Sequence, residues 1–445
     1  MKWNTALYDE LAWRGFLNQQ TSPELFDLYD AWGHTFYLGV DPTADSIHLG
    51  NFVQIMHALQ YIKRGNKFIL IVGGATGMIG DPGGKDAERT FLDKETLASN
   101  VEGIRHDITK ILDHIGEMLG KQLDVEVINN LDFYRDLSYI DFLREVGKYI
   151  TVNQMMNKET VKRRIEDPDA SISYTEFSYM LMQAYDFYLL YTHHNCRLQI
   201  AGSDQWGNLV TGIELINKKT EDTSGDHLVY GATGPLVVDA QGKKFGKSEG
   251  NALWVSEEKN SPYVIYQYFI NTSDEDIEKY LGLLTLLDQE EIAALLRQHQ
   301  EDPAQRYGQQ RLAFLVTEII FGRKAAEQSA MITELLWSKE DKVARIATMS
   351  DEEMVALAKA TWWYNTALSE LDNDDQVAPS TIVHYVSASG LCSSNGEAKK
   401  AIKSGAISLN EQKITDISYQ IQPSDRIQGK LLLLKKWKTY RAIYS

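Results

Sequence analysis

The sequence has only two cysteines, Cys196 and Cys392, among 445 residues. With only two thiols, neither a disulfide framework nor a cysteine-based zinc site is expected. Long hydrophobic runs are also missing: apolar stretches such as Phe68–Val72 are far shorter than the roughly 20 residues of a membrane helix. The first residues include Asp9 and Glu10 and show neither a secretory nor a transit-peptide pattern. These absences predict a cytoplasmic protein without a membrane span.

Positive charge is scarce as well. The chain has 45 Lys and Arg against 62 Asp and Glu, a net charge of −17, which argues against general nucleic-acid affinity. The average conceals an asymmetry, because residues 379–445 carry a net charge of +6 and the remainder −23. A basic tail on an acidic body predicts a module for an anionic partner. The plainer alternative is a chance imbalance on a solvated surface.

Short apolar runs alternate with helical patterns in the first half of the chain. This alternation predicts an α/β fold with a doubly wound, parallel, Rossmann-like sheet. In such sheets ligands bind beyond the carboxyl ends of the strands, so chemistry is expected just after each strand. The expected strands are Thr35–Asp41, Lys67–Thr76, Asp124–Asn130 and Arg197–Gly202. A helix is expected over His48–Arg64, and it ends at Gly65.

From about residue 255 the pattern becomes helical, with Ser261 and Pro262 suited to a helix start. Residues 369–380 are rich in acidic and small polar side chains and resemble a linker. We therefore expect a catalytic domain with a helical insertion over 1–225 and a loop with a helical domain over 226–340. A linker region over 341–378 and a small α+β module over 379–445 follow.

Each of the first two expected strands is followed by a turn with candidate ligand-binding residues. The first turn contains a histidine, and the second is rich in glycine. His48 and Gly50 lie where a helix begins, and a helix N-terminus favours phosphate. Gly39 permits close backbone approach of a ligand because it has no Cβ. The second strand leads into the glycine-rich stretch Val72–Lys85, which contains Asp81. Taken singly, each of these features could equally be a capped helix start or a structural glycine turn.

A lysine-rich loop lies later in the chain, at Gly242–Ser248. It is close to a phosphate-binding P-loop, but the first glycine of that motif is replaced by Gln241, and the loop does not join an early strand to a helix. We reject the P-loop and retain phosphate binding, with a solvated basic loop as the alternative.

Polar residues on one helix indicate the other end of a site. Ser173 and Glu176 have capping-box spacing, and the helix after them places Tyr179, Gln183 and Asp186 on one face. A polar stripe on so apolar a helix is costly to bury unless a ligand or another polar partner meets it; the alternative is that it faces water. Gly202 and Asp204 follow the next expected strand, where they could meet ribose hydroxyls.

In combination these elements resemble the class I aminoacyl-tRNA synthetases, whose two signatures are a His-x-Gly element and a Lys-Met-Ser-Lys-Ser loop. The chain departs from both signatures, at Asn51 and in the loop Lys244–Ser248, and these departures are typical of the tyrosyl family. The resemblance covers essentially the whole chain. It is carried, in order and spacing, by Gly39–Asn51, Val72–Arg89, Ser173–Asn208 and Gly242–Ser248.

The resemblance implies a reaction and its site residues. The enzyme would form tyrosyl-adenylate and pyrophosphate from L-tyrosine and ATP, then transfer tyrosine to the 3′-terminal adenosine of tRNA(Tyr). No tightly bound cofactor and no protein metal site are expected, and Mg²⁺ would accompany ATP. The implied tyrosine contacts are Tyr37 and Asp186 for the phenolic hydroxyl, Asp81, Tyr179 and Gln183 for the ammonium group, and Gln205 near the carboxylate.

For ATP, the resemblance implies adenosine contacts from Gly39, Asp41, Gly50, Gly202 and Asp204. Polyphosphate contacts are implied for Thr43 and His48, and the loops that clamp pyrophosphate contain Lys85, Arg89, Lys244, Lys247 and Ser248.

The basic tail resembles the S4 family of RNA-binding modules. In that family a basic helix grips structured RNA, which implies RNA-binding roles for Lys399, Lys400 and Lys403. The lysines at 435, 436 and 438 could add charge. The resemblance also implies a homodimer formed through the catalytic domain's insertion and a helical segment over 255–340 that helps place the tRNA.

Three rival interpretations are weaker. Tyr37 with Asp186 and the S4-like tail argue against a tryptophanyl-tRNA synthetase. The Lys244–Ser248 loop and the RNA module disfavour a small-molecule adenylyltransferase or ligase. An RNA-binding protein on an inactive synthetase scaffold is disfavoured by the retention of His48 and Asp81 together with both loop lysines.

Overall fold

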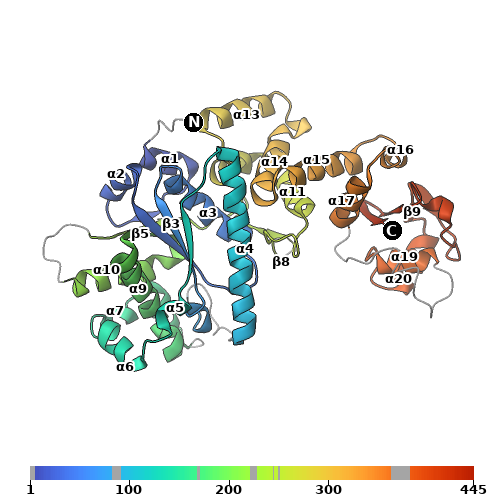
Figure 1. Ribbon diagram of the computed structural model, residues 1–445. Coiled ribbons are helices and arrows are strands. Elements are labelled where there is room, and N and C mark those ends of the chain that lie inside the picture. Colours follow the sequence, from blue (N-terminus) through green and yellow to red (C-terminus); the bar gives the residue numbers. More distant parts are fainter. Residues whose placement is uncertain are drawn as a thin grey trace. The chain divides into compact units, whose positions relative to one another are not determined.

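The computed structural model describes residues 6–82, 92–167, 171–220, 228–243, 245–248, 251–361 and 381–444. The chain divides into two compact units. The first consists of Met1–Ser256 and Thr272–Leu312, and the second of Glu257–Asn271 and Ala313–Ser445. Figure 1 gives the element labels used below.

A six-stranded sheet with the order β1-β6-β5-β2-β3-β4 organises the first unit. All neighbouring strands pair in parallel except β1, which is antiparallel to β6. The α/β fold is therefore confirmed. Each of the four expected strands is present, but the second ends at Val72 and not at Thr76, which begins a 3-10 helix. The strands are β1 (Gln19–Gln20), β2 (Thr35–Val40), β3 (Lys67–Val72), β4 (Val125–Asn129), β5 (Cys196–Gly202) and β6 (Tyr230–Gly234).

The strand β6 was not expected from the sequence. Its five residues include Gly231 and Gly234, and glycine weakens the strand signal. Gly231 is needed because a Cβ built there would lie 1.9 Å from Cδ2 of Leu209, on helix α10. Close packing of the helix on the strand thus requires glycine, and a glycine-rich segment is not recognised as a strand from sequence.

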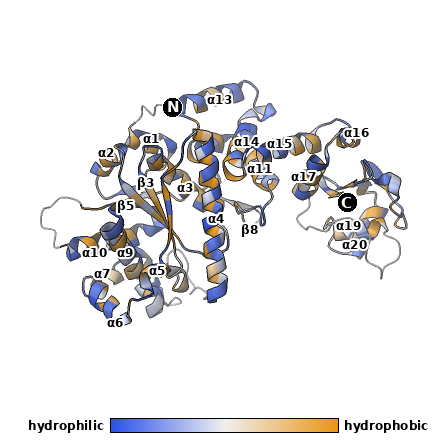
Figure 2. Cartoon of the chain, in the orientation of Figure 1, coloured by the Kyte–Doolittle hydropathy of each residue, from blue (hydrophilic) through white to orange (hydrophobic). Residues whose placement is uncertain are grey.

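Both faces of the sheet are covered by helices. Side chains along β2 alternate between the two faces, so this strand contacts helices on each side. Phe36 points to one face, where its ring lies 5.1 Å from that of Tyr61 on α3. Tyr37 points to the other, where its ring lies 5.2 Å from that of Phe187 on α9. In Figure 2 the central strands are coloured as hydrophobic, as expected for a sheet buried on both sides.

The expected helix over 48–64 is observed as α3, and the long helix α4 runs along the sheet with apolar and polar residues alternating along its length (Figures 1 and 2). Residues 131–166 form the helical insertion, and its buried side chains pack against α9 and α10. The helices described in this unit are α1 (Leu7–Arg14), α2 (Glu24–Asp30), α3 (Leu49–Ile62), η1 (Thr76–Met78), α4 (Lys94–Leu119), α5 (Leu131–Tyr134), α6 (Tyr139–Phe142), η2 (Leu143–Gly147), α7 (Val152–Met156), α8 (Glu159–Glu166), α9 (Tyr174–His194), η3 (Ser203–Gln205), α10 (Trp206–Lys219), α12 (Asp274–Leu284), α13 (Gln289–Glu301) and η4 (Pro303–Gln305).

The second unit combines helices with a four-stranded antiparallel sheet of order β10-β9-β11-β12. The helix α14 (Tyr307–Phe321) contains the boundary between the units. The other elements are α11 (Pro262–Ile270), α15 (Arg323–Trp337), α16 (Lys342–Ile346), α17 (Asp351–Thr361), α19 (Ile382–Ala388), α20 (Asn395–Lys403), β9 (Ile407–Leu409), β10 (Gln412–Ile414), β11 (Leu431–Lys436) and β12 (Thr439–Tyr444).

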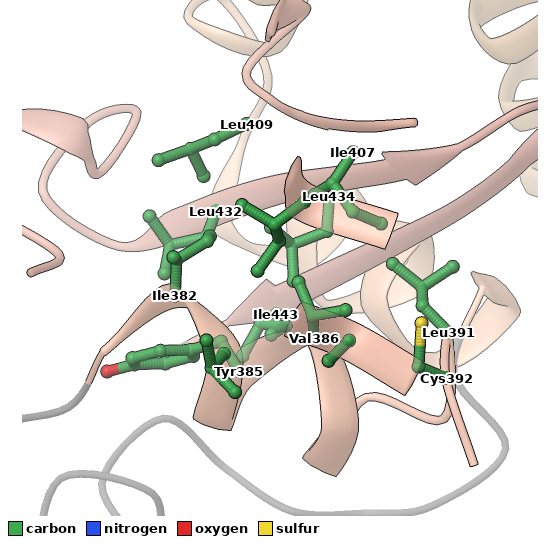
Figure 3. Close-up of a cluster of buried hydrophobic side chains, with 13 residues drawn as sticks. Ile382, Tyr385, Val386, Leu391, Cys392, Ile407, Leu409, Leu432, Leu434 and Ile443 are labelled. Carbon is green, nitrogen blue, oxygen red and sulfur yellow. The ribbon is translucent and has the colours of Figure 1, made fainter. Parts of the chain in front are cut away.

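The run of leucines in β11 is apolar throughout because both faces of this strand are buried. Leu432 and Leu434 belong to a cluster with α19 and α20, in which Figure 3 shows them facing Ile382 and Val386. Leu431 and Leu433 belong to a second cluster with α15, α16 and α17. Much of the expected linker region 341–378 is thus helical and packed against the module's sheet, while residues 362–378 lie outside the described part.

Candidate active site

The expected tyrosine pocket contains a buried carboxyl group. Asp186 on α9 is 3% exposed. Its carboxylate accepts hydrogen bonds from Asn130 Nδ2 at 2.9 Å and from the Tyr134 hydroxyl at 2.8 Å. Burial raises the pKa of Asp186 to about 7, and the two donors only partly oppose that effect. The group is therefore poised to change charge near neutral pH.

Tyr37, on β2, is the second expected residue of this pocket. Its side chain is almost fully buried, and its hydroxyl has no hydrogen-bond partner within the described part of the chain. Burial raises the pKa of the Tyr37 phenol, and the charge of nearby Asp186 raises it further. Buried hydroxyls are normally satisfied, so this unmet donor near a carboxyl group makes the position a candidate for contact with a polar ligand.

A second carboxylate is linked to the first through a chain of hydrogen bonds. The Tyr179 hydroxyl donates to Asp41 Oδ2 and the Thr76 hydroxyl to Asp41 Oδ1, each at 2.7 Å. Asn130 Nδ2 lies 3.1 Å from Thr76 Oγ1 and also donates to Asp186. Asp41 and Tyr179, to which the sequence assigned different ligands, therefore belong to one network.

The network requires a glycine in the loop after β3. A Cβ on Gly73 would lie 2.2 Å from Asp41 Oδ1 and 2.3 Å from Thr76 Oγ1. This finding gives part of the glycine-rich stretch a specific purpose, which is close approach of backbone to the Asp41 carboxylate.

Asp81 and Gln205 meet at the next part of the site. Gln205 Nε2 donates to Asp81 Oδ2 at 2.5 Å, and Asn208 Nδ2 lies 3.4 Å from Asp81 Oδ1. Gln183 is half-buried on α9, the helix that also carries Tyr179 and Asp186. The structure thus brings Asp81 and Gln205 into direct contact although 124 positions separate them.

His48 begins α3 and caps it. Its Nδ1 accepts from the Asn51 backbone N–H at 3.2 Å, and the Asn51 side chain accepts from the His48 backbone N–H at 3.3 Å. With Nδ1 acting as an acceptor, the neutral ring carries its proton on Nε2. A Cβ on Gly50 would lie 2.9 Å from the His48 ring, so glycine leaves room for that ring.

The lysine-rich loop comes back to this helix start. Gly246 has a φ of +76°, and a Cβ there would lie 2.9 Å from Leu49 Cβ and 3.4 Å from the Gly50 nitrogen. Leu253 N donates to Gly246 O, and Leu49 N donates to Leu253 O, each at 2.9 Å. The backbone after Gly246 forms the short strands β7 (Lys247–Ser248) and β8 (Asn251–Ala252). The two signature segments are therefore adjacent.

Some expected residues cannot be placed. Lys85, Arg89 and Lys244 lie outside the described residues, as do the side chains of Lys247 and Ser248.

The remaining nucleotide-site candidates line the same strand ends. Gly39 is exposed on β2, with open space beside it: a Cβ there would meet no atom within 4 Å. Thr43 is exposed, and its backbone N–H donates to Asp41 O at 2.9 Å. At the end of β5, a Cβ on Gly202 would lie 2.7 Å from Asp204 Oδ1, so glycine admits this exposed carboxylate.

Sequence reasoning missed four polar residues of this region: Thr76, Asn130, Tyr134 and Asn208. Asn130 follows β4 directly and is fully buried, so the strand-end rule could have indicated it. The others contact the site only through tertiary folding. Within the described ranges, no group of three or more His, Cys, Asp or Glu side chains could hold a metal ion, and no helix is long and apolar enough to cross a membrane.

The sequence matches two family models. Residues 33–338 match the class I tRNA synthetases of the W and Y type, and residues 370–443 match the SYY-like C-terminal domain of tyrosine–tRNA ligase. Tyrosine–tRNA ligases from Streptococcus gordonii and Streptococcus pneumoniae are each 39% identical over 433 residues, covering 97% of this chain and 98% of theirs. The chain belongs to the tyrosine–tRNA ligase family. The family predicted from the sequence is confirmed.

Solved structures of this family share the fold. A C-terminally truncated mitochondrial tyrosyl-tRNA synthetase from Aspergillus nidulans is 28% identical with a TM-score of 0.67, over 75% of this chain and 95% of that one. The corresponding Coccidioides posadasii enzyme is 27% identical with a TM-score of 0.64, over 74% and 92%. The tyrosine–tRNA ligase C-terminal domain match includes α20, on which Lys399, Lys400 and Lys403 are exposed.

Proposed function

We propose that this chain ligates tyrosine to tRNA(Tyr) in two steps, with the pocket at Tyr37 and Asp186 as its tyrosine site. Similarity to tyrosine–tRNA ligases over 97% of the chain supports the reaction. The observation that supports the site best is the buried, unsatisfied Tyr37 hydroxyl close to the Asp186 carboxyl group.

The substrate's phenol is selected by these two groups. An ionised Asp186 accepts the phenol's proton in a hydrogen bond, while the Tyr37 hydroxyl donates to the phenol's oxygen. Phenylalanine would leave both buried groups without a partner, which costs more than the loss of apolar contact alone. Asn130 and Tyr134 hold the Asp186 carboxylate at the position required.

The amino-acid head group binds at the other end of the pocket. Asp81, Tyr179 and Gln183 take the ammonium group, and Gln205 lies near the carboxylate. The hydrogen bond between Gln205 and Asp81 supports this placement, because it holds an acceptor for the ammonium beside a donor for the carboxylate.

In the first step the tyrosine carboxylate attacks the α-phosphorus of ATP, and pyrophosphate leaves as tyrosyl-adenylate forms. The carboxylate is already a nucleophile, so positioning and charge stabilisation supply the catalysis. Nε2 of His48 donates to the polyphosphate at the N-terminus of α3, with Thr43 beside it. ATP enters as its magnesium complex.

The other ATP contacts follow the family resemblance. The adenosine moiety is contacted by Gly39, Asp41, Gly50, Gly202 and Asp204. The departing pyrophosphate is held by the loops that contain Lys85, Arg89, Lys244, Lys247 and Ser248.

In the second step a hydroxyl of the tRNA's 3′-terminal adenosine attacks the tyrosyl carbonyl carbon, and AMP leaves. The helical segment over 255–340 helps place the tRNA. The module over 379–445 binds it through Lys399, Lys400 and Lys403. The location that we propose is the cytoplasm.

A homodimer through the helical insertion completes the proposal. Large apolar side chains are exposed on the insertion and at the first residue of α9: Tyr139 (60%), Ile140 (63%), Val152 (58%), Met156 (42%), Ile165 (47%) and Tyr174 (64%). The hydroxyls of Tyr139 and Tyr174 lie 2.9 Å apart, so these two belong to one patch. Exposed large apolar side chains that lie together, as these two do, are typical of protein interfaces.

Tyrosine-dependent ATP–pyrophosphate exchange tests the first step, with tryptophan and phenylalanine as controls. We expect exchange with tyrosine only, and charging of tRNA(Tyr) in the complete reaction. Exchange that is absent with tyrosine, or equal with tryptophan, would show that the proposal is wrong. Sedimentation of the wild type and Tyr174→Arg tests the dimer, which should dissociate in the variant.

A further inference from the structure

A tryptophan occupies the tight turn between β11 and β12. Lys436 pairs with Thr439, which leaves Trp437 and Lys438 as the two turn residues. Trp437 has a φ of +57° and its side chain is 74% exposed. Left-handed backbone at the first residue of such a turn favours glycine, and a bulky side chain there is strained. A large apolar ring is thus kept in water at a position where folding favours the smallest residue.

The strands on either side hold the tip of this hairpin in place. Lys436 Nζ bonds to Glu397 Oε1 on α20 at 2.7 Å and to Leu391 O at 3.0 Å. Lys435 Nζ lies 3.4 Å from Glu411 Oε2 and 4.8 Å from the centre of the Tyr440 ring. The aromatic ring therefore projects from a fixed support, which reduces the entropy lost when it binds a partner.

Positive charge accompanies the ring. Lys438 is exposed beside it, and Lys399, Lys400 and Lys403 are exposed on α20, the helix to which Lys436 ties the hairpin. Within the described residues, no acidic side chain forms an ion pair with any of these four lysines. Phosphate binds such a surface through charge, whereas an exposed aromatic ring offers a flat face to an unstacked base.

We propose that Trp437 stacks on an accessible, unpaired base of the RNA bound by this module. The inference rests on the proposed function, because it assigns a further residue to the same RNA-binding surface. A second copy of the chain is a poorer occupant, because its own module would bring like charge to the lysines. Base stacking explains both the exposure and the strain, since a ring held off the fold is available to a ligand.

The test compares full-length Trp437→Gly, Trp437→Phe and Lys438→Ala in binding tRNA(Tyr) across a series of salt concentrations. Glycine suits the turn, so Trp437→Gly should melt at or above the wild-type temperature yet bind tRNA about tenfold more weakly. Its salt dependence should match the wild type, because stacking releases no counterions. Phenylalanine should retain most of the affinity. Lys438→Ala should lower the slope of log K against log salt by about one.

Trp32→Ala serves as the matched control, because Trp32 is 82% exposed in the first unit. It should bind tRNA normally, and all variants should retain wild-type ATP–pyrophosphate exchange. Three outcomes would each overturn the inference. They are wild-type affinity for tRNA in Trp437→Gly, equal losses of tRNA affinity in Trp437→Gly and Trp437→Phe, and a changed oligomeric state. Failure of the wild type itself to charge tRNA(Tyr) would instead overturn the proposed function.

Discussion

The hydroxyl of Tyr134 donates a 2.8 Å hydrogen bond to Asp186 Oδ1 from the helix that follows β4. This bond lowers the pKa of Asp186, although burial still holds it at about 7. Tyr134 is therefore a positioning residue that favours the ionised form of the carboxyl group that we propose recognises tyrosine.

Replacing Tyr134 with phenylalanine should shift the pH dependence of tyrosine binding. Removal of a donor to the charged form raises the pKa of Asp186, so the increase in KM for tyrosine on acidification should begin at a higher pH. Tyrosine-dependent exchange measured from pH 5.5 to 9 checks this shift. Tyr8→Phe, at an exposed tyrosine elsewhere in the chain, is the control. A shift to lower pH would contradict the assignment.

Ionisation of Asp186 should also lower the stability of the folded protein as pH rises. Its pKa is raised from 3.8 in the unfolded chain to about 7, so ionisation is penalised only in the folded state. The folded state is favoured most below pH 3.8, and this contribution is lost as pH rises to about 7. Asp186→Asn should therefore stabilise the protein at pH 8 by up to about 4 kcal/mol, and the gain should fade toward pH 4.

Urea unfolding of the wild type and Asp186→Asn at several pH values measures this difference. A gain that is independent of pH would contradict a titrating Asp186. The same variant should lose tyrosine activation, so stability and activity should move in opposite directions.

Tyr37→Phe should raise the stability of the protein but lower its selectivity for tyrosine over phenylalanine. The change removes a buried hydroxyl that has no partner within the described residues, so stability should rise by about 1 kcal/mol. Discrimination between tyrosine and phenylalanine in the exchange assay should fall, because one of the two groups that meet the phenol is gone. Unchanged discrimination would show that the phenol binds elsewhere.

Gly246→Ala should impair activation through contact between the two signature segments. Gly246 and Gly242 both have a φ of +76°, but only at Gly246 would a Cβ press on Leu49 and Gly50. We expect kcat for exchange to fall about tenfold or more in Gly246→Ala, and Gly242→Ala to show the smaller effect of backbone strain alone. Equal effects would mean that the contact with α3 is unimportant.

Combined replacement of Lys399, Lys400 and Lys403 by alanine should weaken tRNA binding and leave tyrosine activation intact. The slope of log K against log salt should fall by up to about three. This variant is preferable to deletion of residues 379–445, because deletion would uncover the apolar side chains of α15 and α17 that β11 and β12 bury. Loss of ATP–pyrophosphate exchange in the triple variant would argue for a structural role.

Much of the fold could be predicted because it depends on local patterns. Apolar runs predicted the strands β2 to β5, which contain little glycine. The strand β6 was not predicted, because packing of α10 requires Gly231. Helix α9 was indicated by its capping Ser173 and by the polar residues Tyr179, Gln183 and Asp186, which recur at helical spacing. The family resemblance added roles that spacing alone could not assign.

By itself, the sequence determined the α/β sheet, the basic tail and the family, because periodicity, charge and ordered motifs are written along the chain. Only the tertiary structure decided that Asn130 and Tyr134 hold Asp186, and that Gly246 packs against the start of α3. It also decided that Leu431–Leu434 joins two hydrophobic clusters. Hydrogen bonds, burial and steric contact act between residues that are distant in sequence, so their partners are fixed only when the chain is folded.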